Sequence, residues 1–146
     1  MARPPEYENL IKTKAFEEVR PTPGAIAGHL QNAKDYLAAA AQLDAKMSMQ
    51  AFTMAYEGFF QVVQAVLEYH QVRTKEAGRN LAIQRVCVDL QLSAPEFQIV
   101  SRAHARRNAT SYQSPFPPVS RAEADALAAI LLKAIPAAER IALGGL

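Results

Sequence analysis

The feature that most constrains this fold is a broad apolar stripe at helical spacing in the middle of the chain. Its residues recur every three or four positions, which places them on one face of an α-helix. The stripe consists of Met49, Phe52, Tyr56, Phe59, Phe60, Val63, Val66 and Leu67. A helix with so wide an apolar face has to be covered by other helices, so the chain is expected to build a helical layer structure.

Further helices are expected on both sides of the stripe. Apolar spacing predicts a helix over 25–43 and a short helix over 81–90. Two Ser-x-x-Glu sequences, Ser93–Glu96 and Ser120–Glu123, are capping boxes that start the last two helices. In a capping box the Ser side chain accepts from a backbone N–H three residues on, while the Glu side chain reaches back to the Ser N–H.

The two ends of the chain are predicted to be simpler. Residues 7–19 are expected to form a modest first helix, which ends where 20–24 supplies two prolines and a glycine. Residues 72–78 are expected to be a polar loop, and strand signals are nearly absent. The prediction is therefore an all-α, up-and-down bundle of four to five main helices over 25–142. Residues 1–24 form a tail with a short helix, and 143–146 form a second tail.

Composition limits where the protein acts and what it binds. A chain of 146 residues with one cysteine, Cys87, is expected to be a single domain without an intrachain disulfide. Cys87 lies between two valines and is predicted to be a core residue. No signal peptide and no membrane-spanning run is found, so a cytoplasmic protein without membrane partners is expected. With a net charge of only +2, any polyanion site has to be local.

Several classes of chemistry lack their sequence signals. His29, His70 and His104 lie on three different predicted helices, and none has a second metal ligand at the usual spacing. There is no Gly-x-Ser-x-Gly elbow, and the six glycines form no phosphate-binding loop. The sequence therefore predicts no metal and no cofactor.

One basic cluster remains, near the end of the fifth predicted helix. Arg102, Arg106 and Arg107 place three guanidiniums within six positions, and His104 and Asn108 lie among them. Arginine binds phosphate well because its planar fork donates two hydrogen bonds and stays charged. The alternative is an ordinary solvated helix end, since cations also stabilise the C-terminus of a helix.

The run from Arg107 to Tyr112, Arg-Asn-Ala-Thr-Ser-Tyr, resembles the Arg-polar-x-x-x-His signature of the HEPN superfamily. The resemblance extends over roughly 35–142. It includes the Ala-Tyr-Glu sequence at 55–57 and the Gly-Arg-Asn-Leu sequence at 78–81. It implies a HEPN-like bundle and a homodimer that brings two such motifs into one cleft.

The resemblance also implies an RNA-directed function. Many members of the family cut RNA without metal, in toxin–antitoxin or phage-defence systems, with an antitoxin or nucleotidyltransferase partner. Arg107, Asn108, Tyr112 and His104 would then be the catalytic residues. Binding of the nucleic acid would fall to three arginines: Arg102, Arg106 and Arg107.

Two alternatives remain open at this stage. The chain departs from the family pattern at Tyr112, where a histidine is expected, and tyrosine has a pKa of about 10 against about 6.5 for histidine. That substitution favours a noncatalytic HEPN module that binds a nucleotide, RNA or a protein partner. A helical adaptor without this chemistry is the other alternative.

Specific geometry is expected from these interpretations. Arg107 and the Tyr112 hydroxyl should lie within about one phosphate's width of each other, with Asn108 beside them. This requires the helix to end between Arg107 and Tyr112, because five residues turn an ideal helix by roughly 500°. Arg102 and Arg106 should form a rim. The apolar stripe, with its phenylalanines, is expected to exceed what one small bundle can bury and to favour a twofold dimer interface.

Overall fold

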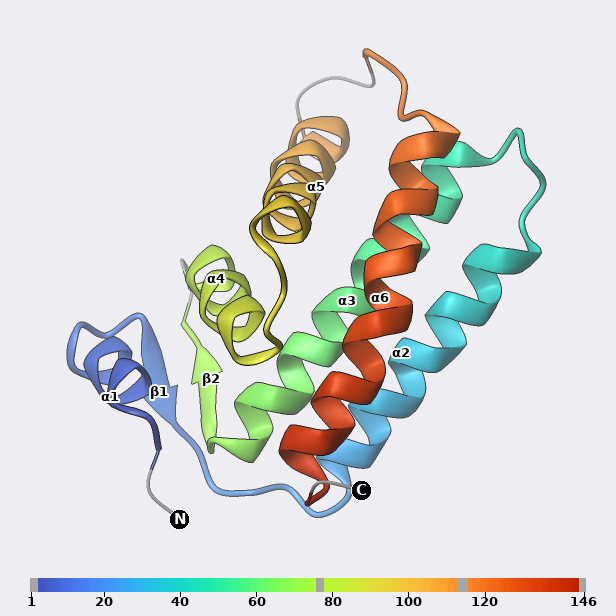
Figure 1. The fold of residues 1–146 in the computed structure, drawn as a ribbon. Helices are drawn as coiled ribbons and strands as arrows, with labels where there is room; N and C mark the ends of the chain where they lie inside the picture. Colours follow the sequence, from blue (N-terminus) through green and yellow to red (C-terminus); the bar gives the residue numbers. More distant parts are fainter. Residues whose placement is uncertain (1–2, 76–77, 113–115, 145–146) are drawn as a thin grey trace.

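The computed structural model describes residues 3–75, 78–112 and 116–144, with side chains described except at 109–112. Within these ranges the chain is mostly helical, as predicted, and Figure 1 shows its course. Its elements are α1 (Pro5–Lys12), β1 (Phe16–Glu18), α2 (Ala25–Gln42), α3 (Ser48–Tyr69), β2 (Val72–Thr74), α4 (Arg79–Asp89), α5 (Ala94–Tyr112) and α6 (Arg121–Ala142).

Helix α3 is the centre of the molecule. Helices α2 and α6 run beside it along most of its length, while α4 and α5 lie on its other side (Figure 1). At Gly58 the three helices approach one another closely, because a Cβ atom there would lie 2.7 Å from Leu131 Cδ2 and 3.0 Å from Tyr36 Cβ. A larger residue would therefore push both α2 and α6 away from α3.

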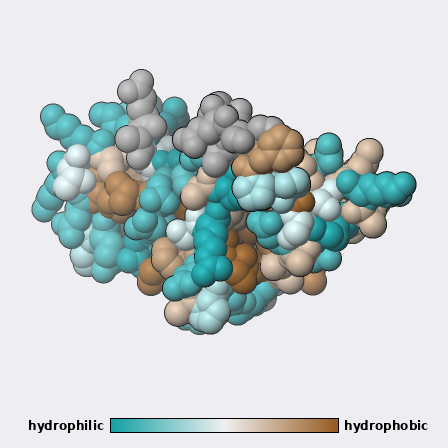
Figure 2. Space-filling model, turned by 90° about the horizontal axis from the view of Figure 1, so that it is seen from above, coloured by the Kyte–Doolittle hydropathy of each residue, from teal (hydrophilic) through white to brown (hydrophobic). Residues whose placement is uncertain are grey.

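The apolar stripe on α3 is buried within a single chain. Phe52 is 1% exposed, Phe59 0% and Phe60 6%. The expectation that this stripe exceeds what one bundle can bury is therefore wrong, because α2, α4, α5, α6 and strand β2 all pack against α3. On the face seen in Figure 2, hydrophobic residues form small separate groups among hydrophilic ones.

The N-terminal segment differs from the modest helix predicted over 7–19. Helix α1 ends at Lys12, and Lys14 takes a positive φ of 66°, which turns the chain back. Phe16–Glu18 then forms β1, with Phe16 buried and both glutamates exposed. Helical spacing predicts that the helix continues through Phe16–Glu18, but these three residues pair with another strand instead.

The partner strand β2 replaces part of the predicted polar loop over 72–78. It pairs antiparallel with β1, so that Phe16 faces Thr74 and Glu18 faces Val72. Charged neighbours suggested a loop, but the β-branched Val72 and Thr74 suit an extended chain. Val72 is 1% exposed, so this strand pair belongs to the core.

Both predicted capping boxes are confirmed. The Glu96 backbone N–H donates to Ser93 Oγ at 3.3 Å, and the Ser93 N–H donates to Glu96 Oε1 at 2.8 Å. The same reciprocal pair starts α6, with distances of 3.1 Å and 3.0 Å between Ser120 and Glu123. These caps fix where α5 and α6 begin.

The predicted core position of Cys87 is confirmed. The residue is 2% exposed, and burial raises the pKa of its thiol to about 12. It therefore stays a neutral packing group on α4, because the thiolate is the reactive form of cysteine.

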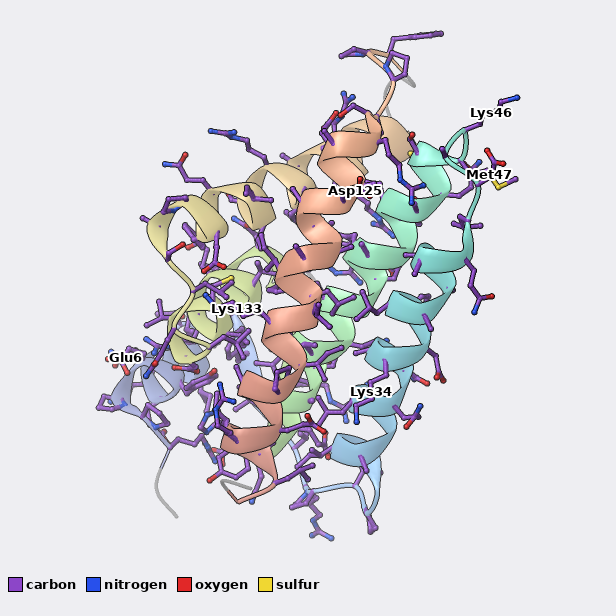
Figure 3. The ribbon with its side chains drawn as sticks, turned by 45° about the vertical axis from the view of Figure 1, so that its right-hand side comes forward. Glu6, Lys34, Lys46, Met47, Asp125 and Lys133 are labelled. Carbon is purple, nitrogen blue, oxygen red and sulfur yellow. The ribbon has the colours of Figure 1, made fainter. Side chains whose placement is uncertain are left out.

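Ion pairs on the outer surface connect neighbouring helices. Lys34 of α2 lies 3.1 Å from Glu139 of α6, and Lys133 of α6 lies 2.8 Å from Glu96 of α5. Figure 3 labels both lysines on the outside of the bundle. In the parts of the chain that the structure describes, none of the helices has the length and apolar character needed to cross a membrane.

Candidate functional site

A polar cluster forms where α3, the start of α4 and the last turns of α5 meet. Helix α5 contributes His104, Arg107 and Asn108, which share a face because they are three and four positions apart. Helix α3 contributes Tyr56 and Glu57, and α4 contributes Arg79. We call these six residues the Tyr56 cluster. The Ala-Tyr-Glu, Gly-Arg-Asn and Arg-Asn segments therefore contact one another in space.

The buried hydroxyl of Tyr56 holds the imidazole of His104. The two atoms, Tyr56 Oη and His104 Nδ1, lie 2.7 Å apart, and Tyr56 is only 1% exposed. On its other side the ring faces Asn108, whose Nδ2 lies 3.4 Å from His104 Nε2. Because an amide nitrogen only donates, Nε2 is the accepting atom and Nδ1 carries the hydrogen that it donates to Tyr56.

Arg107 reaches back from α5 to α3. One of its guanidinium nitrogens lies 3.5 Å from Glu57 Oε1, and another donates to Asn108 Oδ1 at 3.5 Å. Its guanidinium carbon lies 5.6 Å from the centre of the Tyr56 ring. Glu57 Oε1 is buried and accepts no hydrogen bond from the described residues, so this ion pair is a loose one.

Arg79 supplies a second cation from the first turn of α4. Its guanidinium carbon lies 3.9 Å above the ring of Phe60, and its charge reaches both Tyr56 and His104. The position of Arg79 depends on Gly78, because a Cβ atom there would lie 2.7 Å from the Ala15 carbonyl oxygen. Only glycine lets the chain pass this point and start α4 where it does.

The environment sets the charge of the cluster. Burial lowers the pKa of His104 below the ordinary histidine value of 6.5, and the charges of Arg79 and Arg107 lower it further. The ring is therefore neutral at neutral pH. Burial also raises the pKa of Tyr56, which stays a neutral phenol. Two guanidiniums thus face one carboxylate, Glu57, and the cluster carries an excess positive charge.

The other two predicted arginines lie on a different side of α5. Arg106 donates to the Pro117 carbonyl at 2.6 Å, and its Nε lies 3.5 Å from Glu123 on α6. Arg102 is exposed and donates to Gln98 at 3.2 Å. Helix α5 therefore turns Arg107 toward α3, and it turns Arg102 and Arg106 toward α6 and the solvent.

The predicted end of the helix between Arg107 and Tyr112 is wrong. The backbone stays helical through Tyr112, so the two residues differ by about 140° in direction around an ideal helix. Asn108 was expected to compete for backbone hydrogen bonds, but its side chain contacts Arg107 and His104 instead. The predicted contact between Arg107 and the Tyr112 hydroxyl lies outside the described side chains.

Three residues of the cluster were not predicted as site residues. Tyr56 was assigned to the apolar stripe, because periodicity does not distinguish a core tyrosine from one whose hydroxyl holds a histidine. Glu57 and Arg79 came into view only through the family resemblance. The helical register offered one further signal, since Glu57 lies next to the stripe on the side facing α5.

Comparison with known proteins adds no family to this picture. A scan against protein-family models gave no match, and a search of curated proteins gave none. Among the described residues, no group of three or more His, Cys, Asp or Glu side chains is placed to hold a metal ion.

Proposed function

We propose that this chain is a HEPN-like, RNA-directed protein that holds a phosphodiester against Arg79 and Arg107. The observation that supports this most is the convergence of three distant segments on the Tyr56 cluster, with two guanidiniums around one loosely paired carboxylate. A phosphate oxygen offers Arg107 a shorter, charge-assisted hydrogen bond than Glu57 does at 3.5 Å. An incoming phosphate would therefore exchange the 3.5 Å contact between Arg107 and Glu57 for a stronger one.

The binding test compares two arginine variants that lose the same charge. Arg107→Ala should weaken binding of a single-stranded RNA at least tenfold, since a charge-assisted hydrogen bond contributes about 1.5–3 kcal/mol. Arg140→Ala removes the same charge in the last turn of α6, outside the Tyr56 cluster, and should change the affinity less than twofold. Fluorescence anisotropy at two salt concentrations measures both, and the salt dependence should be shallower for Arg107→Ala. RNA binding by Arg107→Ala that equals the wild type would favour the adaptor interpretation.

Metal-independent cleavage of the bound RNA is the second candidate, favoured by His104. Its neutral ring presents Nε2 as an acceptor beside Arg107 and Asn108. In this mechanism Nε2 takes the proton of a ribose 2′-hydroxyl, and the 2′-oxygen forms a bond to the adjacent phosphorus. The bond from phosphorus to the 5′-oxygen breaks and that oxygen takes up a proton. The products are a 2′,3′-cyclic phosphate and a 5′-hydroxyl, and the arginines stabilise the negative charge of the transition state.

Cleavage is tested in EDTA with histidine variants. The wild type should produce cyclic-phosphate ends, and His104→Gln should abolish them while helical circular dichroism stays unchanged. His29→Gln is the matched control, because His29 contacts Gln61 on the far side of the bundle and should leave cleavage intact. A requirement for added divalent metal would contradict the mechanism. Retained RNA binding without cleavage would establish the noncatalytic module that the tyrosine at 112 favours.

The assembly proposed with this function is a symmetric homodimer that brings two Tyr56 clusters into one cleft, in a cytoplasmic toxin–antitoxin or phage-defence setting. An antitoxin or nucleotidyltransferase partner would then control it. Light scattering should give a mass of twice 16.0 kDa at micromolar concentration. A monomer would remove the composite cleft from the proposal and leave binding to one cluster alone.

A further inference from the structure

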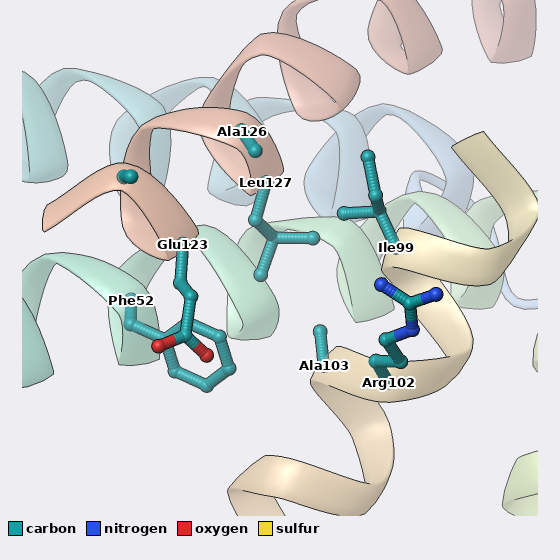
Figure 4. Close-up of a pocket in the computed structure, with 8 residues that line it drawn as sticks. Phe52, Ile99, Arg102, Ala103, Glu123, Ala126 and Leu127 are labelled. Carbon is teal, nitrogen blue, oxygen red and sulfur yellow. The ribbon is translucent and has the colours of Figure 1, made fainter. Parts of the chain in front are cut away.

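A cavity separate from the Tyr56 cluster lies between α3, α5 and α6. Its volume is about 420 Å³, within the range of small-molecule pockets of roughly 300–1,000 Å³. Figure 4 shows Phe52 and Leu127 forming its inner wall, with Ile99 and Arg102 on the α5 side and Glu123 on the α6 side. The cavity exists because the facing surfaces carry short side chains, which are Ala103, Ala122 and Ala126.

The two ends of this cavity differ in charge. At one end, Glu123 is already engaged: its Oε1 accepts from the Ser120 N–H at 3.0 Å, and its Oε2 lies 3.5 Å from Arg106 Nε. At the other end, Arg102 is exposed, and its partner within the described parts of the chain is the neutral amide of Gln98. The cavity lining therefore contains one guanidinium, that of Arg102, and one carboxylate, that of Glu123. Because Arg106, which lies outside the lining, already pairs with Glu123, the charge of Arg102 has no paired carboxylate among the described residues.

We propose that this cavity binds a small amphipathic anion. An apolar body of one or two rings packs against Phe52 and Leu127, and a carboxylate or sulfonate group faces Arg102. An amphipathic cation fits the apolar wall equally well, but it would meet the uncompensated charge of Arg102. This site is independent of the proposed RNA-directed function, because it uses the α6 side of α5 and none of the residues of the Tyr56 cluster.

The test uses two probes of the same apolar body and opposite charge, naphthalene-2-sulfonate and 2-naphthylmethylammonium. Titrated into the full-length, ¹⁵N-labelled protein, the sulfonate should shift the amide signals of Ala103, Ala126 and Leu127 saturably. The ammonium should bind at least tenfold more weakly. Arg102→Gln should remove this difference by weakening the sulfonate at least tenfold. Arg140→Gln, which removes the same charge at a distance, should not.

Two pocket-filling variants test the apolar wall. Ala126→Met should block binding of both probes. If that variant does not fold, Ala122→Leu replaces it, because Ala122 is more exposed and tolerates a longer side chain; it should block both probes as well. The proposal is overturned if neither probe binds, if both charges bind equally, or if the filled variants still bind the sulfonate. Amide shifts in the pocket that follow protein concentration without any probe would also overturn it, because a second copy of the chain would then cover the cavity.

Discussion

Two buried tyrosines, Tyr7 and Tyr56, each lie at the centre of a polar cluster with a histidine, an arginine and a carboxylate. Around Tyr7 the contacts are short. Its hydroxyl donates to Asp89 Oδ2 at 2.5 Å, and Arg85 donates to the other oxygen of Asp89 at 2.5 Å. The His70 ring lies 4.3 Å from the Tyr7 ring. These contacts join α1 to α4 and to the end of α3.

Around Tyr56 the hydroxyl contact is also short, at 2.7 Å to His104 Nδ1, but the contact between arginine and carboxylate is long. Arg107 lies 3.5 Å from Glu57, against 2.5 Å for Arg85 and Asp89, and a second guanidinium from Arg79 lies close by. A tight pair in a mostly buried place resists exchange, since each partner would be left uncompensated. A loose pair with surplus cation loses little when an anion from outside replaces the carboxylate. The contacts of the Tyr7 cluster thus hold elements together, whereas the longer ion pair of the Tyr56 cluster is what the proposed exchange with a phosphate requires.

The largest expected effect is a difference in the free energy of unfolding between variants of the two clusters. Asp89→Asn should lower the free energy of unfolding by about 3 kcal/mol, because it leaves the largely buried Arg85 without its closest charge. The matched Glu57→Gln should lower it by less than about 1 kcal/mol. It should also raise RNA affinity, if the proposed phosphate site is correct, because Arg107 loses its internal competitor. Urea unfolding measures the first difference, and equal losses in both variants would break the comparison.

A smaller effect is expected at the residue that touches both regions. Gly78 packs against the Ala15 carbonyl of the N-terminal segment and directly precedes Arg79. Gly78→Ala should destabilise the fold by about 1–3 kcal/mol through this clash, and should weaken RNA binding by moving Arg79. Gly28→Ala is the control, because a Cβ there meets nothing within 4 Å and should stabilise α2 by about 0.5–1 kcal/mol. Thermal unfolding of both variants checks the opposite signs.

The smallest expected effect is a pH dependence of the free energy of unfolding, to which His70 and His104 both contribute. Burial lowers the pKa of both His70 and His104 below 6.5. The unfolded chain therefore binds protons first, and stability should fall as the pH drops below about 6.5 toward the folded-state values. His70→Gln and His104→Gln should each reduce this loss between pH 7.5 and 5.5, which urea unfolding at the two pH values measures.

Bound RNA sharpens the same experiment. A phosphate beside Arg107 should raise the pKa of His104, because it adds negative charge near the ring, and should leave His70 unchanged. Titration of the two imidazole signals by nuclear magnetic resonance separates them. An equal rise at both histidines would mean that the RNA acts on the whole protein rather than at the Tyr56 cluster.

Sequence periodicity predicted the large helices well and the small strands poorly. Helices α2, α3 and α6 bury long stripes with many repeats, so three-to-four spacing identified them, and the capping serines located two starts. Strands β1 and β2 have three residues each, and their pairing joins positions that are far apart in the sequence. Such a pair has no local pattern, because each strand is stabilised by the other and by the core beneath it.

The candidate site was predictable only in part, for a similar reason. His104, Arg107 and Asn108 are close in sequence, so helical geometry alone placed them on one face. Tyr56 and Arg79 join them through tertiary packing. The sequence suggests that they belong to the site only through resemblance to a family.

The pairing of β1 with β2 also means that β1 has to wait during synthesis before it can fold. Phe16, buried in the finished protein, has no partner strand until Thr74 has left the ribosome, roughly 3–12 s later at about 5–20 residues per second. Throughout that interval an aromatic segment is exposed on a nascent chain. The two glutamates that follow it, Glu17 and Glu18, are exposed in the folded protein and contribute charge beside the phenylalanine. Charges beside an exposed aromatic residue are expected to oppose association of that segment with other chains.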